Sequence, residues 1–198
     1  MSLFASLLKN SVIMDIETSG LSKDQDFITC IGLMTSSGIH QVTQPASVFR
    51  DDPMEAENNL LAAFDAMQGS FSDKFLITYN GISFDVPFIN DRFSTQNLNS
   101  VFAPTKHLDL MQYSREIHGR HVKKDDTARH LCNLYVPWSC SAAYLARVYK
   151  SQCVSEEDHM HMLAHNALDL TITAQMLGRM FQFDSFHTFI NKNKIEVD

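Results

Sequence analysis

The sequence contains little cysteine and lacks any apolar run long enough to cross a membrane. The 198 residues include four cysteines that form no Cys-x-x-Cys pair, namely Cys30, Cys132, Cys140 and Cys153. This pattern excludes a disulfide-dense scaffold and predicts buried free thiols in a reducing cytoplasm. Residues 1–8 have neither a basic start nor a clear cleavage site, so they predict a helical turn or a strand lead-in. We therefore expect a cytoplasmic protein that does not bind membranes.

Glycine and proline are also scarce, with 7 and 5 residues, and no segment rich in Pro, Gly or Ser divides the chain. Internal repeats and low-complexity segments are absent. A hydrophobic content of 44% and a charged content of 20% are those of an ordinary globular protein with a substantial core. We expect residues 1–198 to form one domain, and the sequence leaves its oligomeric state open.

An excess of basic residues is missing as well, because the formal net charge is −7. This sign argues against a protein that coats DNA non-specifically. It does not exclude a nuclease, since acidic residues of an active site contribute to the charge and bound metal would offset part of it.

The pattern of apolar residues predicts a mixed α/β layer fold with helices on both faces of a sheet. Three strands with short connections, expected near residues 11–18, 27–34 and 38–43, suggest an antiparallel meander. A further strand is expected over residues 75–79, and residues 106–110 fit a strand end or a helix entry. Helices are expected over residues 53–67, from residue 85 onward, and over 110–118, 125–133, 141–148, 156–180 and 184–191.

Two acidic residues, Asp15 and Glu17, stand where the first strand ends. Side chains at i and i+2 of a strand point to the same side, roughly 6 to 7 Å apart. Two uncompensated carboxylates at this separation repel each other and lose hydration. A divalent cation removes that conflict, and oxygen ligands suit Mg²⁺ or Mn²⁺. The alternative is an exposed strand end that carries two unrelated acids.

Other candidate residues lie farther along the chain. Asp85 follows the strand expected at 75–79, where it fits either a helix N-cap or a position beside the end of the first strand. His161, His165 and Asp169 are spaced four residues apart and share one face of the expected helix 156–180. That stripe fits metal ligation, a polar helix surface or a zinc site, although no cysteine supports zinc.

Taken in order, these residues belong to three motifs: DIETSGL (residues 15–21), TYNGISFDVPFI (78–89) and HNALD (165–169). The motifs resemble those of the DEDD superfamily of 3′–5′ exonucleases, which have a ribonuclease H-like fold. The second motif is similar to that of family B DNA polymerase proofreading domains. With HLDL (107–110), the pattern looks like the YprB-like ribonuclease H-like subgroup. The resemblance covers residues 11–177.

The resemblance implies a ribonuclease H-like mixed β-sheet, a three-strand antiparallel meander plus parallel strands, flanked by helices. It also implies a two-metal exonuclease with two Mg²⁺ or Mn²⁺ ions about 4 Å apart. Asp15, Glu17 and Asp169 would hold the ion that carries the nucleophilic water, while Asp15 would bridge to a second ion contacted by Asp85. His165 would orient or deprotonate that water. The implied partner is a single-stranded 3′ end of DNA or RNA.

The same resemblance suggests residues that contact substrate. Gly20 would let the backbone approach the strand, Leu21 would wedge against the terminal base, and Asn80 and Phe84 would line the pocket. For Leu21 and Phe84, packing in the core is the alternative. Asp109 would support the site without binding metal.

A basic segment over residues 114–130 is a candidate for contact with backbone phosphates. It contains five cations and three histidines, and the cations are Arg115, Arg120, Lys123, Lys124 and Arg129. The alternative is a solvated charged loop.

Three questions about function stay open from the sequence. His165 lies four residues before Asp169, whereas histidine-type members of the superfamily place it five residues before and tyrosine-type members place a Tyr four before. The competing functions are a non-catalytic nucleic-acid-binding or scaffold domain with the same fold, and a structure-specific endonuclease. The sequence does not distinguish DNA from RNA.

Overall fold

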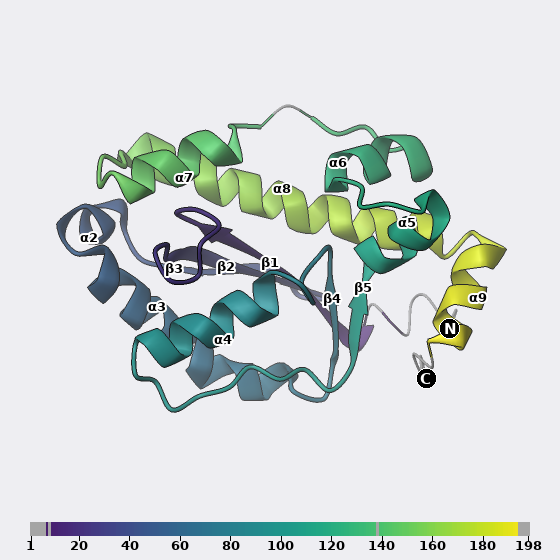
Figure 1. Cartoon of the computed structure of the whole chain (residues 1–198), viewed down its shortest axis with the longest axis horizontal. Helices are drawn as coiled ribbons and strands as arrows, with labels where there is room; N and C mark the ends of the chain where they lie inside the picture. The colour runs from purple at the N-terminus through teal and green to yellow at the C-terminus, as the bar shows by residue number, and fades with distance from the viewer. Residues whose placement is uncertain (1–6, 8, 138, 194–198) are drawn as a thin grey trace.

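The computed structural model describes residues 7, 9–137 and 139–193. Its centre is a five-stranded sheet of order β3-β2-β1-β4-β5 (Figure 1). The strands are β1 (Ser11–Thr18), β2 (Ile28–Thr35), β3 (Gly38–Thr43), β4 (Phe75–Thr78) and β5 (His107–Asp109). The first three form an antiparallel meander, β4 pairs with β1 in parallel, and β5 pairs with β4 in parallel. The predicted mixed sheet is therefore confirmed.

Helices connect and flank the strands: α2 (Ala46–Asp51), α3 (Pro53–Gln68), α4 (Asp85–Thr95), α5 (Leu110–His118), α6 (Lys124–Asp126), α7 (Ala142–Lys150), α8 (Glu156–Met180) and α9 (Asp184–Lys192). The chain also forms a 3-10 turn, η1 (Gly69–Phe71), and a π-helical turn, η2 (Thr127–Leu131). The helix expected over 125–133 is thus broken into α6 and η2. Helix α2 was not predicted, because its six residues are too few to show a helical period. Residues 1–6 and 8, for which a helical turn or a strand lead-in is expected, lie outside the described residues.

The side chains of β1 alternate between two cores. Val12, Met14 and Ile16 belong to a buried cluster that includes side chains of α3 and α4, whereas Ile13 belongs to a second cluster with side chains of α8. Figure 1 shows α3 and α4 on one side of the sheet and α8 on the other. Because strand side chains alternate, the odd-numbered residues that follow Ile13 turn toward α8.

The long helix α8 begins at a capping box. The Ser155 hydroxyl accepts a hydrogen bond from the Asp158 backbone N–H, and the Asp158 carboxylate accepts one from the Ser155 N–H. The helix has 25 residues, so it extends for roughly 37 Å. It packs across β1 and β2, which brings its middle turns against the end of β1.

The four cysteines differ in how exposed they are. Cys30 and Cys132 are buried free thiols, Cys140 is half-buried, and Cys153 is exposed, so the expectation of buried thiols is wrong for Cys153. In the part of the chain that the structure describes, no helix combines the length and apolarity that crossing a membrane requires.

Candidate active site

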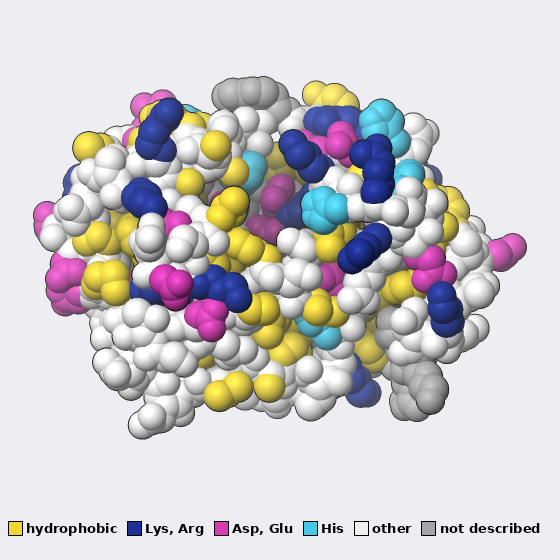
Figure 2. Space-filling model, viewed as in Figure 1, with side chains coloured by type: hydrophobic (Ala, Val, Ile, Leu, Met, Phe, Trp, Pro, Cys, Tyr) yellow, Lys and Arg dark blue, Asp and Glu magenta, His cyan; other side chains and the backbone are white. Residues whose placement is uncertain are grey.

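A cleft of about 960 Å³ opens where β1 and β4 end. Five of the residues singled out in the sequence line it together: Asp15, Glu17, Asp85, His165 and Asp169. The first two come from β1, the third begins α4, and the last two lie one turn apart on α8. Figure 2 shows acidic side chains at the bottom of this hollow. Three elements that are distant in sequence therefore direct carboxylates toward one place.

Asp85 lies beside the end of β1, which is one of the two positions that the sequence left open, and it is not a helix N-cap. It is the first residue of α4, whose N-cap is Phe84. The Asp85 Oδ1 atom accepts a hydrogen bond of 3.1 Å from the backbone N–H of Ile16, between the two acids of β1. The side chain is 5% exposed, so its carboxylate joins α4 to the end of β1.

A lysine that the sequence analysis assigned to the basic segment reaches into the carboxylates. The Lys124 Nζ atom lies 2.6 Å from Asp15 Oδ1 and 2.7 Å from Asp169 Oδ2. Its side chain is 13% exposed, so the ion pairs are largely shielded from water. The chain itself therefore supplies a positive charge to Asp15, at the place where the sequence predicts a divalent cation.

The position of this ammonium bears on metal binding. The acidic side chains of the cleft offer carboxylate oxygens as metal ligands, which suits a hard divalent cation such as Mg²⁺ or Mn²⁺. The ammonium between Asp15 and Asp169 indicates that a positive charge is favourable there. Among residues 7, 9–137 and 139–193, no three His, Cys, Asp or Glu side chains converge on one point as metal ligands. The oxygen donors suit such an ion in type, and an ion between Asp15 and Asp169 would have to displace Lys124, whose four-carbon stem is flexible.

Burial and mutual repulsion favour the neutral forms of these acids. Burial, with a contribution from the charge of Asp15, raises the pKa of Asp85 to about 8. Burial also raises the pKa of Glu17 well above its ordinary value, helped by Asp15 and Asp169. The pKa of Asp15 is raised by burial although Lys124 opposes the shift. Burial opposes the charge of Lys124, but Asp15 and Asp169 outweigh it and raise the pKa of this lysine.

The raised pKa of Asp85 predicts how stability depends on pH. Between pH 3.8 and about pH 8, Asp85 keeps its proton in the folded chain but has lost it in the unfolded chain. The free energy of unfolding in EDTA should therefore fall as pH rises through this range, and Asp85→Asn should make the slope shallower. Urea denaturation between about pH 5 and 8 measures both slopes. An equal slope in the variant would mean that Asp85 is ionised in the folded protein.

Asn166, which the sequence analysis did not assign, fixes Asp15 from α8. Its Nδ2 atom donates to the backbone oxygen of Asp15 at 3.1 Å and to Oδ2 at 3.3 Å. Its Oδ1 atom accepts from Gln41 Nε2 at 3.0 Å. Gly32 pairs with Asp15 across the sheet, and a Cβ atom there would lie 2.0 Å from Asn166 Oδ1. The absence of a side chain at Gly32 therefore gives Asn166 room to reach β1.

The two histidines of α8 differ in their surroundings. His165 lines the cleft, and its Nδ1 atom forms a 2.9 Å hydrogen bond with the Ser139 hydroxyl. His161 is exposed and does not line the cleft. The described residues therefore give no support to the zinc alternative, which required both histidines.

The four residues suggested to contact substrate also line the cleft: Gly20, Leu21, Asn80 and Phe84. Leu21 is 82% exposed, which rules out the core-packing alternative for this residue. Phe84 lines the cleft and also packs against the core. At Gly20, a Cβ atom would lie 2.3 Å from Asp26 Oδ2, so a contact within the chain already requires glycine.

Asp109 supports the loop that carries Asn80. Its carboxylate accepts hydrogen bonds from the backbone N–H groups of Asn80, Ile82 and Met111, at 2.7, 3.1 and 3.0 Å. Asn80 has φ +74°, a left-handed conformation that asparagine tolerates better than most residues. The structure thus shows how Asp109 fixes the backbone beside the cleft without facing the carboxylate cluster.

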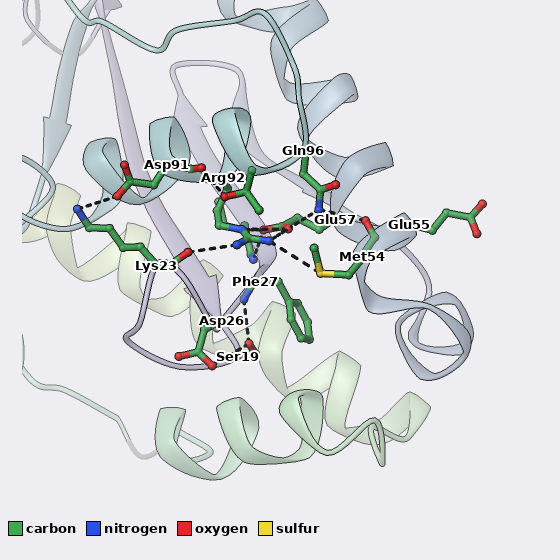
Figure 3. A network of polar contacts seen from close by, with 12 residues as sticks. Ser19, Lys23, Asp26, Phe27, Met54, Glu55, Glu57, Asp91, Arg92 and Gln96 are labelled. Carbon is green, nitrogen blue, oxygen red and sulfur yellow. Dashed lines mark hydrogen bonds and ion pairs between the residues drawn. The ribbon is translucent and has the colours of Figure 1, made fainter.

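The turn that carries Gly20 and Leu21, residues 19–26, is fixed on one side by a buried ion pair (Figure 3). Arg92 of α4 donates to both oxygens of Glu57 of α3, at distances from 2.6 to 3.1 Å. Arg92 also donates to the backbone oxygen of Lys23 in the turn, at 3.1 Å. The pair is almost fully buried, and its additional hydrogen bonds offset the cost of removing two charges from water.

On its other side, the same turn is joined to α7. The Lys150 Nζ atom lies 2.7 Å from Asp26 Oδ1, and both residues line the cleft. The hydrogen bonds from Ser22 and Lys150 lower the pKa of Asp26 against the opposing effect of burial. The ion pair therefore joins the two walls of the cleft, a contact that no sequence motif indicated.

The sheet order, the flanking helices and the clustered carboxylates together define a ribonuclease H-like protein. A family model confirms this class, because RNase_H_2 of the RNase H superfamily matches residues 12–181. The chain belongs to this family.

Three solved structures share the fold. A family B DNA polymerase from the archaeon Pyrobaculum calidifontis gives a TM-score of 0.62 at 14% identity, covering 84% of this chain and 24% of the polymerase. A nuclease in its apo form gives 0.53 at 17% identity, covering 92% and 79%. Brucella melitensis NrnC bound to pGG gives 0.52 at 15% identity, covering 98% and 84%. This chain thus spans about a quarter of the polymerase. No curated protein matches the sequence.

Proposed function

We propose that this protein is a metal-dependent 3′–5′ exonuclease that hydrolyses phosphodiester bonds at the ends of single-stranded DNA or RNA. One observation carries the proposal: four acids and a histidine from three elements line one cleft in a member of the RNase H superfamily. An acidic cluster on a surface that served only for binding would repel a nucleic acid, so its location in the cleft favours catalysis.

The carboxylates would hold two divalent ions, Mg²⁺ or Mn²⁺. Asp15, Glu17 and Asp169 would share one ion, and Asp15 and Asp85 would share the other. When bound, the ions would supply the positive charge that an anionic phosphodiester and a hydroxide need in order to approach each other. Asn166 would keep the Asp15 carboxylate in place through its hydrogen bond.

His165 would act on the attacking water. Its Nδ1 atom forms a hydrogen bond with Ser139, and in the tautomer whose Nδ1–H donates to that hydroxyl, Nε2 is free to accept the proton. The water oxygen would form a bond to phosphorus, and the bond from phosphorus to the 3′ oxygen of the preceding nucleotide would break. That oxygen would take a proton from solvent, giving a nucleoside 5′-monophosphate and a strand that is shorter by one nucleotide.

An ion pair across the cleft favours cleavage at a terminus over cleavage within a strand. The Lys150–Asp26 ion pair joins the turn of residues 19–26 to α7. A strand that continued in both directions would have to pass this contact. The exposed Leu21 and the ring of Phe84 lie on the same cleft, where each offers an apolar surface to a terminal base.

The test uses the wild-type protein with linear and circular single strands of DNA and RNA, in Mn²⁺ or in EDTA. Linear strands labelled at the 5′ end should shorten stepwise in Mn²⁺ and stay intact in EDTA, while circular strands should survive. Cleavage of circles would favour the endonuclease alternative. A protein that binds strands but cleaves none of them would be the non-catalytic alternative.

Lys124→Met should change stability and metal affinity in opposite directions. Without the ammonium, the buried carboxylates lose their counter-ion, so the metal-free protein should lose roughly 3 kcal/mol of stability. Mn²⁺ should bind more tightly, because no cation of the chain competes for Asp15 and Asp169. Melting in EDTA and calorimetric titration measure the two effects, with the exposed Lys123→Met as the control. Unchanged values would mean that Lys124 does not occupy the site in solution.

A further inference from the structure

A second cavity, of about 500 Å³, is lined mainly by cations and histidines, with one acid among them. Its charged or titratable residues are His118, Arg120, His121, Lys123, Asp126 and His130. They come from the end of α5, the loop of residues 119–123, α6 and η2. Figure 2 shows Lys, Arg and His side chains gathered over the α5 and α6 region, beside the hollow that contains the acids.

Two cations, Arg120 and Lys123, line this cavity. In the described ranges, with their gaps at residues 8 and 138, neither Arg120 nor Lys123 takes part in an ion pair. By contrast, Lys124 next to them pairs with Asp15 and Asp169. In a chain of net charge −7, two unpaired cations in one cavity beside one acid indicate a site for an anion.

The cavity is connected to the cleft through the backbone. Tyr79 lines the cleft, and its hydroxyl donates to the backbone oxygen of Val122, a lining residue of the cavity, at 2.6 Å. Lys123 faces the cavity, and the next residue, Lys124, reaches the carboxylates. Neighbouring Cα atoms are 3.8 Å apart, so the two sites lie within the reach of one short strand.

We propose that this cavity binds backbone phosphates of the single strand whose 3′ end occupies the cleft. The inference rests on the proposed function for the cleft. A guanidinium, an ammonium and imidazole N–H groups are donors suited to phosphate oxygens, and they read no base. The cavity would thus hold the part of the strand on the 5′ side of the cleaved bond, so that longer strands bind more tightly than dinucleotides.

The experiment measures binding without cleavage, by fluorescence anisotropy of labelled single strands in EDTA at several salt concentrations. Strands of increasing length, from dinucleotides upward, are compared for the wild type and for Arg120→Gln/Lys123→Gln. The control, Lys9→Gln/Lys74→Gln, removes the same charge just before β1 and β4, at the opposite ends of these strands from the acids. Inorganic phosphate and a mononucleotide serve as competitors.

We expect the double variant to bind long strands about 10-fold more weakly than the wild type. The slope of log K against log salt concentration should become shallower by roughly 1.4, because two phosphate contacts are lost. Dinucleotide binding and the control should change little. Equal losses in the control would overturn the proposal in favour of general charge attraction, and equal losses for all lengths would also overturn it. Competition by the mononucleotide at comparable concentration would identify a free-nucleotide site instead.

The binding experiment tests the basic cavity independently of the proposed nuclease activity. Because binding is measured in EDTA, a protein that proves unable to cleave strands can still show the length dependence. If the wild type cleaves linear strands in Mn²⁺ but the double variant retains full affinity for long strands, the cleft assignment stands and the assignment of the basic cavity fails.

Discussion

Asp169→Ala should eliminate Mn²⁺ binding in the cleft and reduce cleavage of linear single strands by at least about 10³-fold, more than the 10- to 100-fold typical of a supporting residue. Asp169 projects from α8 toward β1, and its Oδ2 atom lies 2.7 Å from Lys124 Nζ, which also contacts Asp15. The substitution removes one of the two carboxylates that make this point attractive to a cation. The remaining acids belong to β1 and to the start of α4.

The measurements are calorimetric titration with Mn²⁺ and single-turnover cleavage. Asp73→Ala is the matched control, because Asp73 is exposed and lies just before β4, away from the cleft. Folding of the variant is checked by its melting curve in EDTA, where loss of the Lys124 partner should lower stability. An Asp169→Ala protein that binds Mn²⁺ and cleaves strands normally would show that this carboxylate is not a ligand.

The sequence was sufficient to predict the elements that carry the acids. Asp15 and Glu17 end an apolar strand, and a period of two determines that they share a face. His165 and Asp169 lie within an apolar helical period, which predicted the bounds of α8 correctly. The sequence does not predict that α8 covers the face of β1 to which the odd-numbered side chains point. Strand alternation defines the two faces of β1, but only the packing of the whole fold determines which helix covers each face.

Contacts between distant residues were the part that the sequence could not give. In the sequence, Lys124 is one cation of a basic segment, and no feature of the neighbouring residues distinguishes it from Lys123. One of them contacts Asp15, which is 109 residues away in sequence, and the other faces the second cavity. Likewise, the pairing of Lys150 with Asp26 follows from the packing of α7 against the turn after β1. Spacing rules describe neighbours along one element, whereas these pairs depend on how elements meet.

The helix expected over 125–133 shows a related limit. Its apolar spacing is helical, yet the chain forms α6 and then the π-helical turn η2. Thr127 is buried in η2, and its hydroxyl forms hydrogen bonds with Tyr79 and Ser114. These side-chain contacts provide a tertiary reason for the irregular turn, and π-helical turns often occur near functional sites.

His165→Ala should separate the histidine from the carboxylates. Mn²⁺ affinity should stay nearly unchanged, while single-turnover cleavage should fall by roughly 10² to 10⁴-fold, the usual contribution of a general base. His165 lines the cleft one helical turn from Asp169, but it makes no ion pair with the acids among the described residues. Its hydrogen bond to Ser139 orients the ring and leaves the other nitrogen for water.

Two further variants test that role. His161→Ala, one turn earlier on α8 and exposed, should cleave at the wild-type rate. Ser139→Ala should lower cleavage by about 10-fold, because the imidazole loses the partner that orients it. The comparison tests whether a histidine four residues before Asp169 can act on the water. A helix turns about 100° per residue, so a change of one position moves a side chain to another face. Near-normal turnover in His165→Ala would remove this histidine from the mechanism and leave the four carboxylates as the catalytic set.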